Sequence, residues 1–146
     1  MPDSPERCYE LEIPAKAQYV SLARLLASSI ARSMSFPEED VDDLKVAVSE
    51  MCTNAIVHSG NGTAEKPPIL VRYCAGRDYL RVQVSDRGPG FDIGCVLNRE
   101  RTDLLEKGRG IPLIQCLVDE FQCDSQPGSG TVVTVVKYLR PRESQP

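Results

Sequence analysis

The sequence predicts an α+β fold, a two-layer α/β sandwich in which three helices cover one face of a mixed, mostly antiparallel sheet. Three segments place apolar residues at the spacing of a helix, and about five others have the alternation or apolar content of strands. Most of these strands are joined in pairs by short polar connections, which favours antiparallel hairpins. The chain of 146 residues is long enough for one core, so we expect a single domain over residues 1–146.

The composition is that of a globular protein that is not embedded in a membrane. Hydrophobic residues make up 41% of the chain and charged residues 26%. No apolar run approaches the roughly 20 residues of a membrane helix, and the N-terminus lacks the layout of a signal peptide. We therefore expect a cytoplasmic protein. The net charge of −4 argues against direct binding to nucleic acid. The polar ends, residues 1–7 and 141–146, are expected to fray.

The first half of the chain predicts one strand and two helices. Residues 8–13 alternate loosely and predict an edge strand. Apolar residues at helical spacing predict a helix over 15–34. A cap at Ser35, a proline in the first turn and an acid three positions after the cap then begin a second helix. This helix is expected to end near His58.

The second half predicts two hairpins and a third helix. The first hairpin is expected to pair strands at 69–74 and 79–86. The third helix is expected at 111–120, and the second hairpin at 121–125 and 131–138. Asp86 has the parity of the apolar face of its strand. An acid there is unfavourable without a partner, so Asp86 is expected to border a pocket. Residues 91–107 are rich in charge and lack periodicity, which is typical of a mobile lid.

The six cysteines do not form a recognisable framework. They are scattered, with no C-x-x-C pair, and the chain has one histidine. Most lie inside apolar patterns, where a free cysteine behaves as a small hydrophobic residue. We therefore expect reduced, mostly buried thiols rather than a disulfide framework, a zinc site or a redox site. The six are Cys8, Cys52, Cys74, Cys95, Cys116 and Cys123.

The second helix carries the first motif with chemical potential. Glu50, Asn54 and His58 follow one another at intervals of four residues and therefore share a stripe. Asn54 offers an oxygen ligand for Mg²⁺, which binds phosphates through few protein ligands and several waters. Glu50, one turn away, would take a proton from an attacking hydroxyl or water. The alternative is an ordinary polar helix face, with His58 complementing the helix dipole.

The second motif is Asp86-x-Gly88-x-Gly90, at the end of a predicted strand. It fits a simple turn, because Asp and Gly are common turn residues. It also fits a ligand site, in which the Asp86 carboxylate accepts a hydrogen bond from the exocyclic amine of a base. The glycines would then let the ligand and the backbone approach closely. The parity of Asp86 favours the ligand site.

The third motif is a pair of glycines, Gly108 and Gly110, that opens the third helix. The free N–H groups and the dipole of a helix N-terminus favour a phosphate. Lys107 and Arg109 flank this position and would neutralise phosphate charge, or else lie on a solvated lid. The alternative is a flexible loop end, because neither a P-loop lysine motif nor a G-x-G-x-x-G is present.

Taken in order, these motifs resemble those of the GHKL ATPases and kinases, which have the Bergerat ATP-binding fold. E-x-x-x-N-A-x-x-H resembles the N box of that superfamily, D-x-G-x-G its first glycine box, and G-x-G-I its second. Gly130-Thr131 before the last strand is similar to its terminal Gly-Thr element. Within the superfamily, the chain resembles most the small anti-sigma factor serine/threonine kinases of the sporulation and general-stress type.

This resemblance implies ATP and Mg²⁺ as cofactors. It implies that Asn54 ligates Mg²⁺, and that Glu50 is the general base. Asp86 would recognise adenine with help from Thr131. Arg24, on the first helix, resembles a partner-contact position. The glycines would shape the pocket and its lid: Gly88, Gly90, Gly108 and Gly110. Two departures are visible, a proline immediately after the second glycine box and a lid that matches poorly.

The resemblance also implies partners and a reaction. The chain would hold a sigma factor inactive and phosphorylate a serine or threonine on an anti-sigma factor antagonist of the STAS type, and it would form a homodimer. One alternative is a non-catalytic ATP-binding regulator that only sequesters its partner. Another is the detached catalytic domain of a histidine kinase. The last fits less well, because the single histidine lies inside the nucleotide motif and no dimerising helical hairpin is present.

Overall fold

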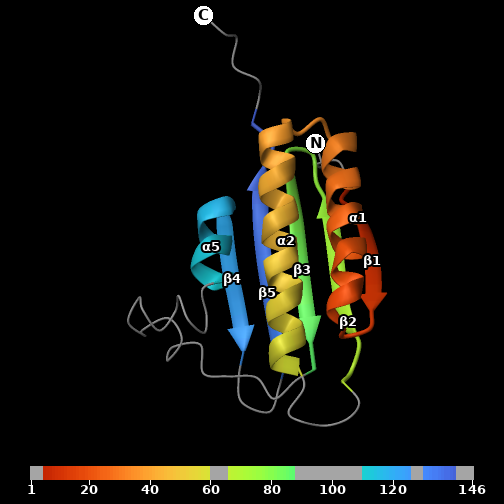
Figure 1. The fold of residues 1–146 in the computed structure, drawn as a ribbon. Coiled ribbons are helices and arrows are strands. Elements are labelled where there is room, and N and C mark those ends of the chain that lie inside the picture. The colour runs from red at the N-terminus through yellow and green to blue at the C-terminus, as the bar shows by residue number, and fades with distance from the viewer. Residues whose placement is uncertain (1–4, 60–65, 88–109, 126–129, 141–146) are drawn as a thin grey trace, which may run out of the picture.

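The computed structural model describes residues 5–59, 66–87, 110–125 and 130–140. These residues form one five-stranded sheet of order β1-β2-β3-β5-β4, and the helices lie on one of its faces (Figure 1). The α+β prediction is confirmed, and every strand pairing among the described residues is antiparallel. The elements are β1 (Arg7–Ile13), a 3-10 helix (Ala17–Tyr19), α1 (Val20–Ser33), α2 (Glu38–Ser59), β2 (Ile69–Ala75), β3 (Tyr79–Asp86), α5 (Gly110–Leu117), β4 (Glu120–Ser125) and β5 (Thr131–Tyr138).

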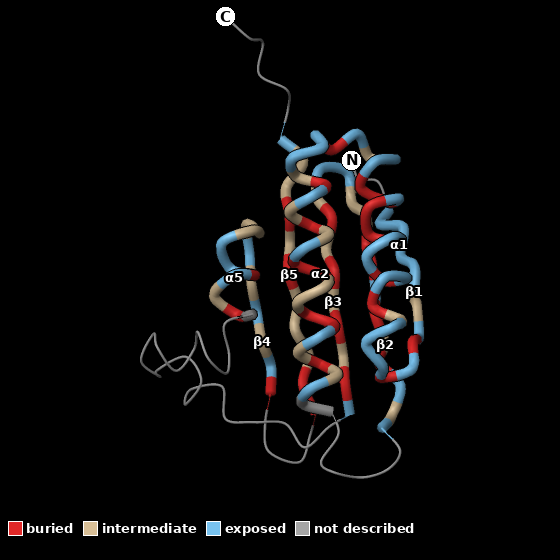
Figure 2. The backbone as a smooth tube through the Cα atoms, in the orientation of Figure 1, coloured by how far each residue is buried: buried red, intermediate tan, exposed pale blue. Residues whose placement is uncertain are grey.

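The hydrophobic core lies between the sheet and the helix layer. α2 runs over the middle of the sheet, with α1 on the side of β1 and β2 and α5 over β4 (Figure 1). Buried residues lie along α2 and β3 where the helix packs on the sheet, and exposed residues alternate with them on the helices (Figure 2). Tyr73 crosses this layer, because its buried hydroxyl donates a hydrogen bond of 2.8 Å to the carbonyl of Ala23. Among the described residues, we find no helix with the length and apolar character needed to cross a bilayer.

A buried lysine ties the helix layer to the sheet. Lys137 of β5 is only 8% exposed and lies on the helix-facing side of the sheet. Its ammonium group donates a hydrogen bond of 2.8 Å to the carbonyl of Leu117, where α5 ends. It also lies 3.4 Å from the carboxylate of Asp43 and 3.8 Å from that of Asp40, both on α2. A buried charge needs such partners, so Lys137 fixes the positions of α2 and α5 relative to β5.

The corner between α1 and α2 is built differently from the prediction. The sequence predicts Ser35 as the cap of the second helix, and this is wrong: Ser35 follows α1 with a positive φ of 70°. Its N–H donates to the carbonyl of Arg32 at 3.0 Å, and the N–H of Phe36 donates to the carbonyl of Ala31 at 3.1 Å. This pair of bonds is a Schellman motif, which ends α1. The carbonyl of Pro37 then accepts the first backbone bonds of α2.

Two helix boundaries also differ from the sequence prediction. α1 begins at Val20, because a separate 3-10 turn precedes it. α5 ends at Leu117, three residues before its predicted end. The carboxylate of Asp119 accepts a hydrogen bond of 2.7 Å from the backbone N–H of Tyr138 and one of 2.9 Å from the guanidinium of Arg140. These bonds hold Asp119 against β5, so the chain leaves the helix and enters β4.

The predicted frayed end is shorter than expected. The carboxylate of Glu6 lies 2.9 Å from the guanidinium of Arg81, and β1 already begins at Arg7. The prediction of fraying over residues 1–7 therefore does not hold for Glu6 and Arg7. Residues 1–4 and 141–146 lie outside the described residues.

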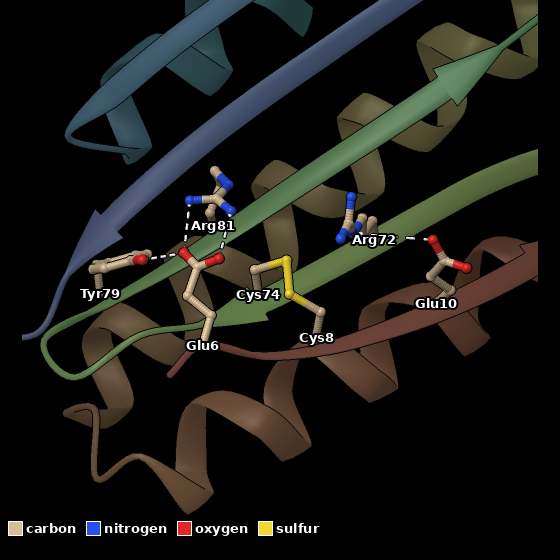
Figure 3. Close-up of a disulfide and its surroundings, with 7 residues drawn as sticks. All are labelled: Glu6, Cys8, Glu10, Arg72, Cys74, Tyr79 and Arg81. Carbon is tan, nitrogen blue, oxygen red and sulfur yellow. Dashed lines mark hydrogen bonds and ion pairs between the residues drawn. A yellow bond between two sulfur atoms is a disulfide. The ribbon is translucent and has the colours of Figure 1, made fainter. Parts of the chain in front are cut away.

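Two of the six cysteines form a disulfide, which corrects the prediction of reduced thiols. Cys8 and Cys74 are directly opposite in the register of β1 and β2, and their sulfur atoms are bonded (Figure 3). The prediction of a buried thiol holds for Cys52, because burial raises the pKa of Cys52 to about 12. The others are the exposed Cys116, the half-buried Cys123, and Cys95, which lies outside the described residues.

Candidate active site

The described parts of the sequence motifs lie at one end of the sandwich. β3 and β4 end there, β5 begins there, and the C-terminal end of α2 reaches the same level (Figure 1). The fold brings these segments together because β5 pairs with both β3 and β4, although β3 and β5 are far apart in the sequence. Strand ends and a helix end therefore frame one candidate site.

A row of three buried polar side chains crosses this end of the sheet. Asp86 is opposite Thr131 in the β3–β5 register, and Thr131 is opposite Ser125 in the β4–β5 register. Their exposed fractions are only 7%, 5% and 8%. The hydroxyl oxygens of Ser125 and Thr131 are 2.7 Å apart and share a hydrogen bond. Buried polar groups are held in place by polar partners, so this row fixes a carboxylate and two hydroxyl groups at the edge where the strands end, a set of groups suited to recognising a polar ligand.

The charge of Asp86 reaches the neighbouring thiol. Burial, together with the negative charges of Asp124 and Asp86, raises the pKa of Cys123 to about 11. Cys123 therefore keeps its proton at neutral pH, and it lines the helix-facing side of β4 as a weakly polar group.

Gly130 lets the beginning of β5 lie against the end of β3. Its φ is +78°, a conformation that other residues rarely adopt. A Cβ atom at this position would lie 2.4 Å from the carbonyl oxygen of Asp86 and 3.2 Å from the Cα of Arg87. Only glycine permits this approach, which places Thr131 directly beside Asp86.

Glu50 and Asn54 lie at the rim of the helix layer. Both are half-buried, and they stand one turn apart on α2, next to the fully buried Met51. A half-buried carboxylate and carboxamide can meet a ligand from solvent while the helix holds their backbones in place. The oxygen of the Asn54 amide is a ligand that suits Mg²⁺, which takes few protein oxygens and completes its shell with phosphate and water.

The structure describes part of the remaining predicted site. Gly110 is the first residue of α5, as the sequence predicts for the opening of a helix. Pro112 lies in the first turn, where its missing N–H removes no helical hydrogen bond. His58 lies in the last turn of α2, and its side chain is outside the described residues. Five predicted residues fall wholly outside them: Gly88, Gly90, Lys107, Gly108 and Arg109.

Ser125 is the member of the row that sequence reasoning did not assign. The signal was available in the predicted hairpin of 121–125 with 131–138, because Ser125 and Thr131 flank its connection. A polar residue at the end of a strand, opposite a residue already assigned to the site, deserves the same role as its neighbour. The observed register places the two hydroxyl groups on the same face of the sheet.

Arg24 lies in a different place, on the outer side of the helix layer. It is exposed on α1 and lines an open groove of about 460 Å³ between α1 and α2. The other lining residues are Asp42, Lys45, Val46 and Ser49, all from α2. The groove thus combines both signs of charge with an apolar side chain that is 43% exposed, Val46. Such a mixed surface is suited to a protein partner rather than to a nucleotide.

Comparison with known families identifies the domain. The profile described as "Histidine kinase-like ATPase domain" matches residues 13–137, which is most of the chain. The chain belongs to this family. Membership confirms the resemblance to the GHKL ATPases, and it makes ATP the nucleotide that such a domain uses.

Curated relatives within this family are similar over nearly their whole length. The chain is 38% identical over 139 residues to the serine-protein kinase RsbW of Bacillus pumilus, covering 89% of this chain and 85% of the relative. It is also 38% identical over 138 residues to the serine-protein kinase RsbW of Bacillus velezensis, with 89% and 84% covered.

A solved structure has a fold similar to that of this chain. The RsbU and RsbW domains of Rv1364c from Mycobacterium tuberculosis align with a TM-score of 0.68 at 21% identity, covering 92% of this chain and 33% of that chain. At this identity the likeness concerns the fold alone. It agrees with the antiparallel five-stranded sheet and the single helix layer described above.

Proposed function

We propose that the chain is a cytoplasmic, ATP-dependent protein serine/threonine kinase that also acts as an anti-sigma factor. It holds a sigma factor inactive, and it phosphorylates a serine or threonine on an anti-sigma factor antagonist of the STAS type. The observation that carries the proposal is the buried row of Asp86, Thr131 and Ser125, at the end of the sheet that the C-terminal end of α2 also reaches (Figure 1). Glu50 and Asn54 lie in the second half of that helix. The similarity to proteins named serine-protein kinase supports the choice of acceptor.

The row binds the adenine end of the nucleotide in this proposal. The buried Asp86 carboxylate accepts a hydrogen bond from the exocyclic amine of adenine. Guanine carries an oxygen at that position, which the carboxylate repels, so the row also selects the base. Thr131 offers its hydroxyl to the same ring edge, and Ser125 holds that hydroxyl at 2.7 Å.

The phosphate end of the site lies along α2. Asn54 would hold Mg²⁺ through its amide oxygen, and the ion neutralises charge that develops on the phosphates. Glu50, one turn away, accepts the proton of the serine or threonine hydroxyl that attacks. The proposal extends the phosphate and lid contacts to other residues at this end of the chain: His58, Gly88, Gly90, Lys107, Gly108, Arg109 and Gly110.

The partner surface in this proposal is the groove beside Arg24. An arginine beside charges of both signs and the exposed Val46 is a composition suited to a protein interface. Two leucines of the same helix are also exposed, Leu22 at 48% and Leu25 at 64%. The sigma factor and the antagonist would each dock on this surface, and the chain would associate as a homodimer.

Binding of Mg-ATP is expected to stabilise the folded chain. At about 100 times its dissociation constant, the ligand adds about 2.7 kcal/mol to the free energy of unfolding. For a domain of this size, the melting temperature should rise by roughly 5–10 °C. Thermal melts with Mg-ATP, Mg-ADP and Mg-GTP test this, and GTP should give the smaller shift. The absence of any shift with ATP or ADP would remove the nucleotide site and with it the proposed function.

Transfer of labelled phosphate tests the activity itself. The chain is incubated with γ-labelled Mg-ATP, a candidate STAS-type antagonist and, separately, a sigma factor. We expect label on a serine or threonine of the antagonist and none on the sigma factor. If ATP binds and the sigma factor is sequestered but no label is transferred, the chain is a non-catalytic regulator instead.

Ser125→Ala is expected to weaken ATP binding without removing it. The variant loses the hydrogen bond that positions the Thr131 hydroxyl, a bond between neutral groups worth about 0.5–1.5 kcal/mol, so the dissociation constant should rise about twofold to tenfold. Calorimetric titration with Mg-ATP measures this. Ser33→Ala is the matched control, because the Ser33 hydroxyl donates only to the carbonyl of Ile30 within α1. In a Thr131→Val background, Ser125→Ala should have no further effect, and an additive effect would exclude a role through Thr131.

A further inference from the structure

The disulfide lies on the face of the sheet that the helices leave uncovered. Cys8 of β1 and Cys74 of β2 are direct register partners. Tyr73, the preceding residue of β2, points into the helix layer, where its hydroxyl reaches Ala23. Side chains alternate along a strand, so Cys74 points to the opposite face. Figure 3 shows the two sulfur atoms on that face, with the helices behind the sheet.

The two cysteine residues differ in exposure. Cys8 is an exposed residue of the edge strand, whereas Cys74 is only 2% exposed. Cys8 is therefore the side of the bond that a nucleophile from solvent would approach. Disulfide exchange depends on access to one sulfur atom as well as on the attacking thiolate.

Ion pairs flank the disulfide on both sides (Figure 3). The Glu6 carboxylate accepts two hydrogen bonds from the Arg81 guanidinium, at 2.9 and 3.0 Å, and a further one from the hydroxyl of Tyr79. On the other side, the Glu10 carboxylate lies 3.9 Å from the guanidinium of Arg72. The Glu10–Arg72 pair is exposed and adds little, whereas the bidentate Glu6–Arg81 pair adds more. The covalent bond is nevertheless the one connection between β1 and the rest of the sheet, among those of the described residues, that a thiol can break.

The proposed function implies that this disulfide is exposed to a reducing compartment. A protein that binds a sigma factor works in the cytoplasm, where thiols are kept reduced. Disulfides that do form in that compartment are usually transient and sense redox conditions. A bond with one exposed cysteine on an edge strand fits a reversible link better than a permanent one. This step rests on the proposed function, because it requires a reducing compartment.

We propose that Cys8 and Cys74 form a thiol–disulfide exchange site, attacked at Cys8, whose oxidation state controls how firmly β1 is anchored to the sheet. The ligand class is a small thiol such as glutathione, or a dithiol protein. β1 leads through a short 3-10 turn into α1, which carries Arg24. The site therefore lies on the segment that precedes the proposed partner surface.

The exchange takes place in two balanced steps. A thiolate attacks the Cys8 sulfur, the bond between the two cysteine sulfurs breaks, and Cys74 leaves as a thiolate with the electron pair. A second thiolate then attacks the incoming sulfur of the mixed disulfide and releases Cys8 as a thiolate. In sum, two thiols are oxidised to one disulfide while the protein disulfide is reduced to two thiols. The reverse reaction, which forms the Cys8–Cys74 bond again, needs a disulfide such as glutathione disulfide as the oxidant.

The first experiment follows the bond itself in the folded, full-length chain. The protein is treated with reduced or oxidised glutathione, alkylated with N-ethylmaleimide and mapped by peptide mass. We expect both cysteines to become alkylated in reduced glutathione and to be protected again in oxidised glutathione. Cys116, an exposed free thiol, serves as the internal reference. A bond that opens only in denaturant, or never forms in oxidised glutathione, overturns the proposal.

The second experiment measures the anchoring of β1. Closing a loop with a sequence separation of 66 residues constrains the unfolded chain. Reduction should therefore lower the melting temperature by about 5–15 °C. Hydrogen exchange should become faster in residues 7–13, while β5 serves as an unchanged reference. Cys8→Ser should melt at the lower temperature with or without reductant. A shift on reduction that persists in Cys8→Ser, or no change in β1, overturns the anchoring role.

A metal site is the competing outcome. Among the described residues, ligand atoms of Glu6, Cys8 and Cys74 lie within 4.8 Å of one another. If Zn²⁺ protects the reduced pair from alkylation without any oxidant, the site binds metal and the exchange proposal fails. The alkylation experiment does not test the proposed kinase function, because it reports only on the state of the cysteines. A chain that exchanges thiols but does not bind ATP would refute the proposed function and leave the exchange chemistry standing.

Discussion

Glu50→Gln is expected to reduce phosphate transfer to the antagonist by about 10²–10⁴-fold, the range typical of a lost general base. The amide has the shape of the carboxylate but cannot accept the proton of the attacking hydroxyl. Glu50 is half-buried at the rim of α2, and no other residue of the described site is proposed to take that proton. ATP binding should be unchanged, because Asp86 and Asn54 are untouched.

Single-turnover transfer with saturating Mg-ATP measures this loss. Glu39→Gln is the matched control, since Glu39 is an exposed acid in the first turn of the same helix. The control should transfer phosphate at the wild-type rate, and both variants should show the wild-type melting shift with ATP. Transfer by Glu50→Gln at the rate of Glu39→Gln would show that another group, or water, is the base.

The local patterns of the sequence were sufficient for the fold class and for the strand face and helix spacing of three candidate site residues. Alternation in 79–86 placed Asp86 on the apolar face, and the structure finds it there, 7% exposed. The interval of four residues placed Glu50 and Asn54 on adjacent turns, and α2 keeps them there. Such predictions succeed because the parity of a strand and the period of a helix depend only on neighbouring residues.

Features that depend on pairing between distant segments were missed. The bond between Cys8 and Cys74 requires the register of strands separated by 66 residues, which no local pattern contains. The hydroxyl pair of Ser125 and Thr131 required the register of a hairpin that was predicted but not followed to its end. The prediction for Ser35 was wrong for another reason. Ser35 takes part in the Schellman motif that ends α1, so it does not cap α2.

Asp86→Asn is expected to weaken Mg-ATP binding by one to two decades in the dissociation constant. In the proposed site, the wild-type carboxylate makes a charge-assisted hydrogen bond to the adenine amine, worth about 1.5–3 kcal/mol. The same substitution should not lower the stability of the protein without nucleotide. A buried carboxylate is costlier to desolvate than a neutral amide, so the melting temperature without nucleotide should not fall with the affinity.

The choice of base gives the sharper test of the same residue. The carboxylate of Asp86 repels the oxygen of guanine, whereas the amide of the variant can donate a hydrogen bond to it. The ratio of the dissociation constants for GTP and ATP should therefore fall in Asp86→Asn. Asp124→Asn is the matched control, because Asp124 is an exposed acid two strands away, on β4. It should keep both the affinity and the ratio. If Asp86→Asn binds ATP as tightly as this control, the row of Asp86, Thr131 and Ser125 does not bind adenine, and the nucleotide must be anchored elsewhere.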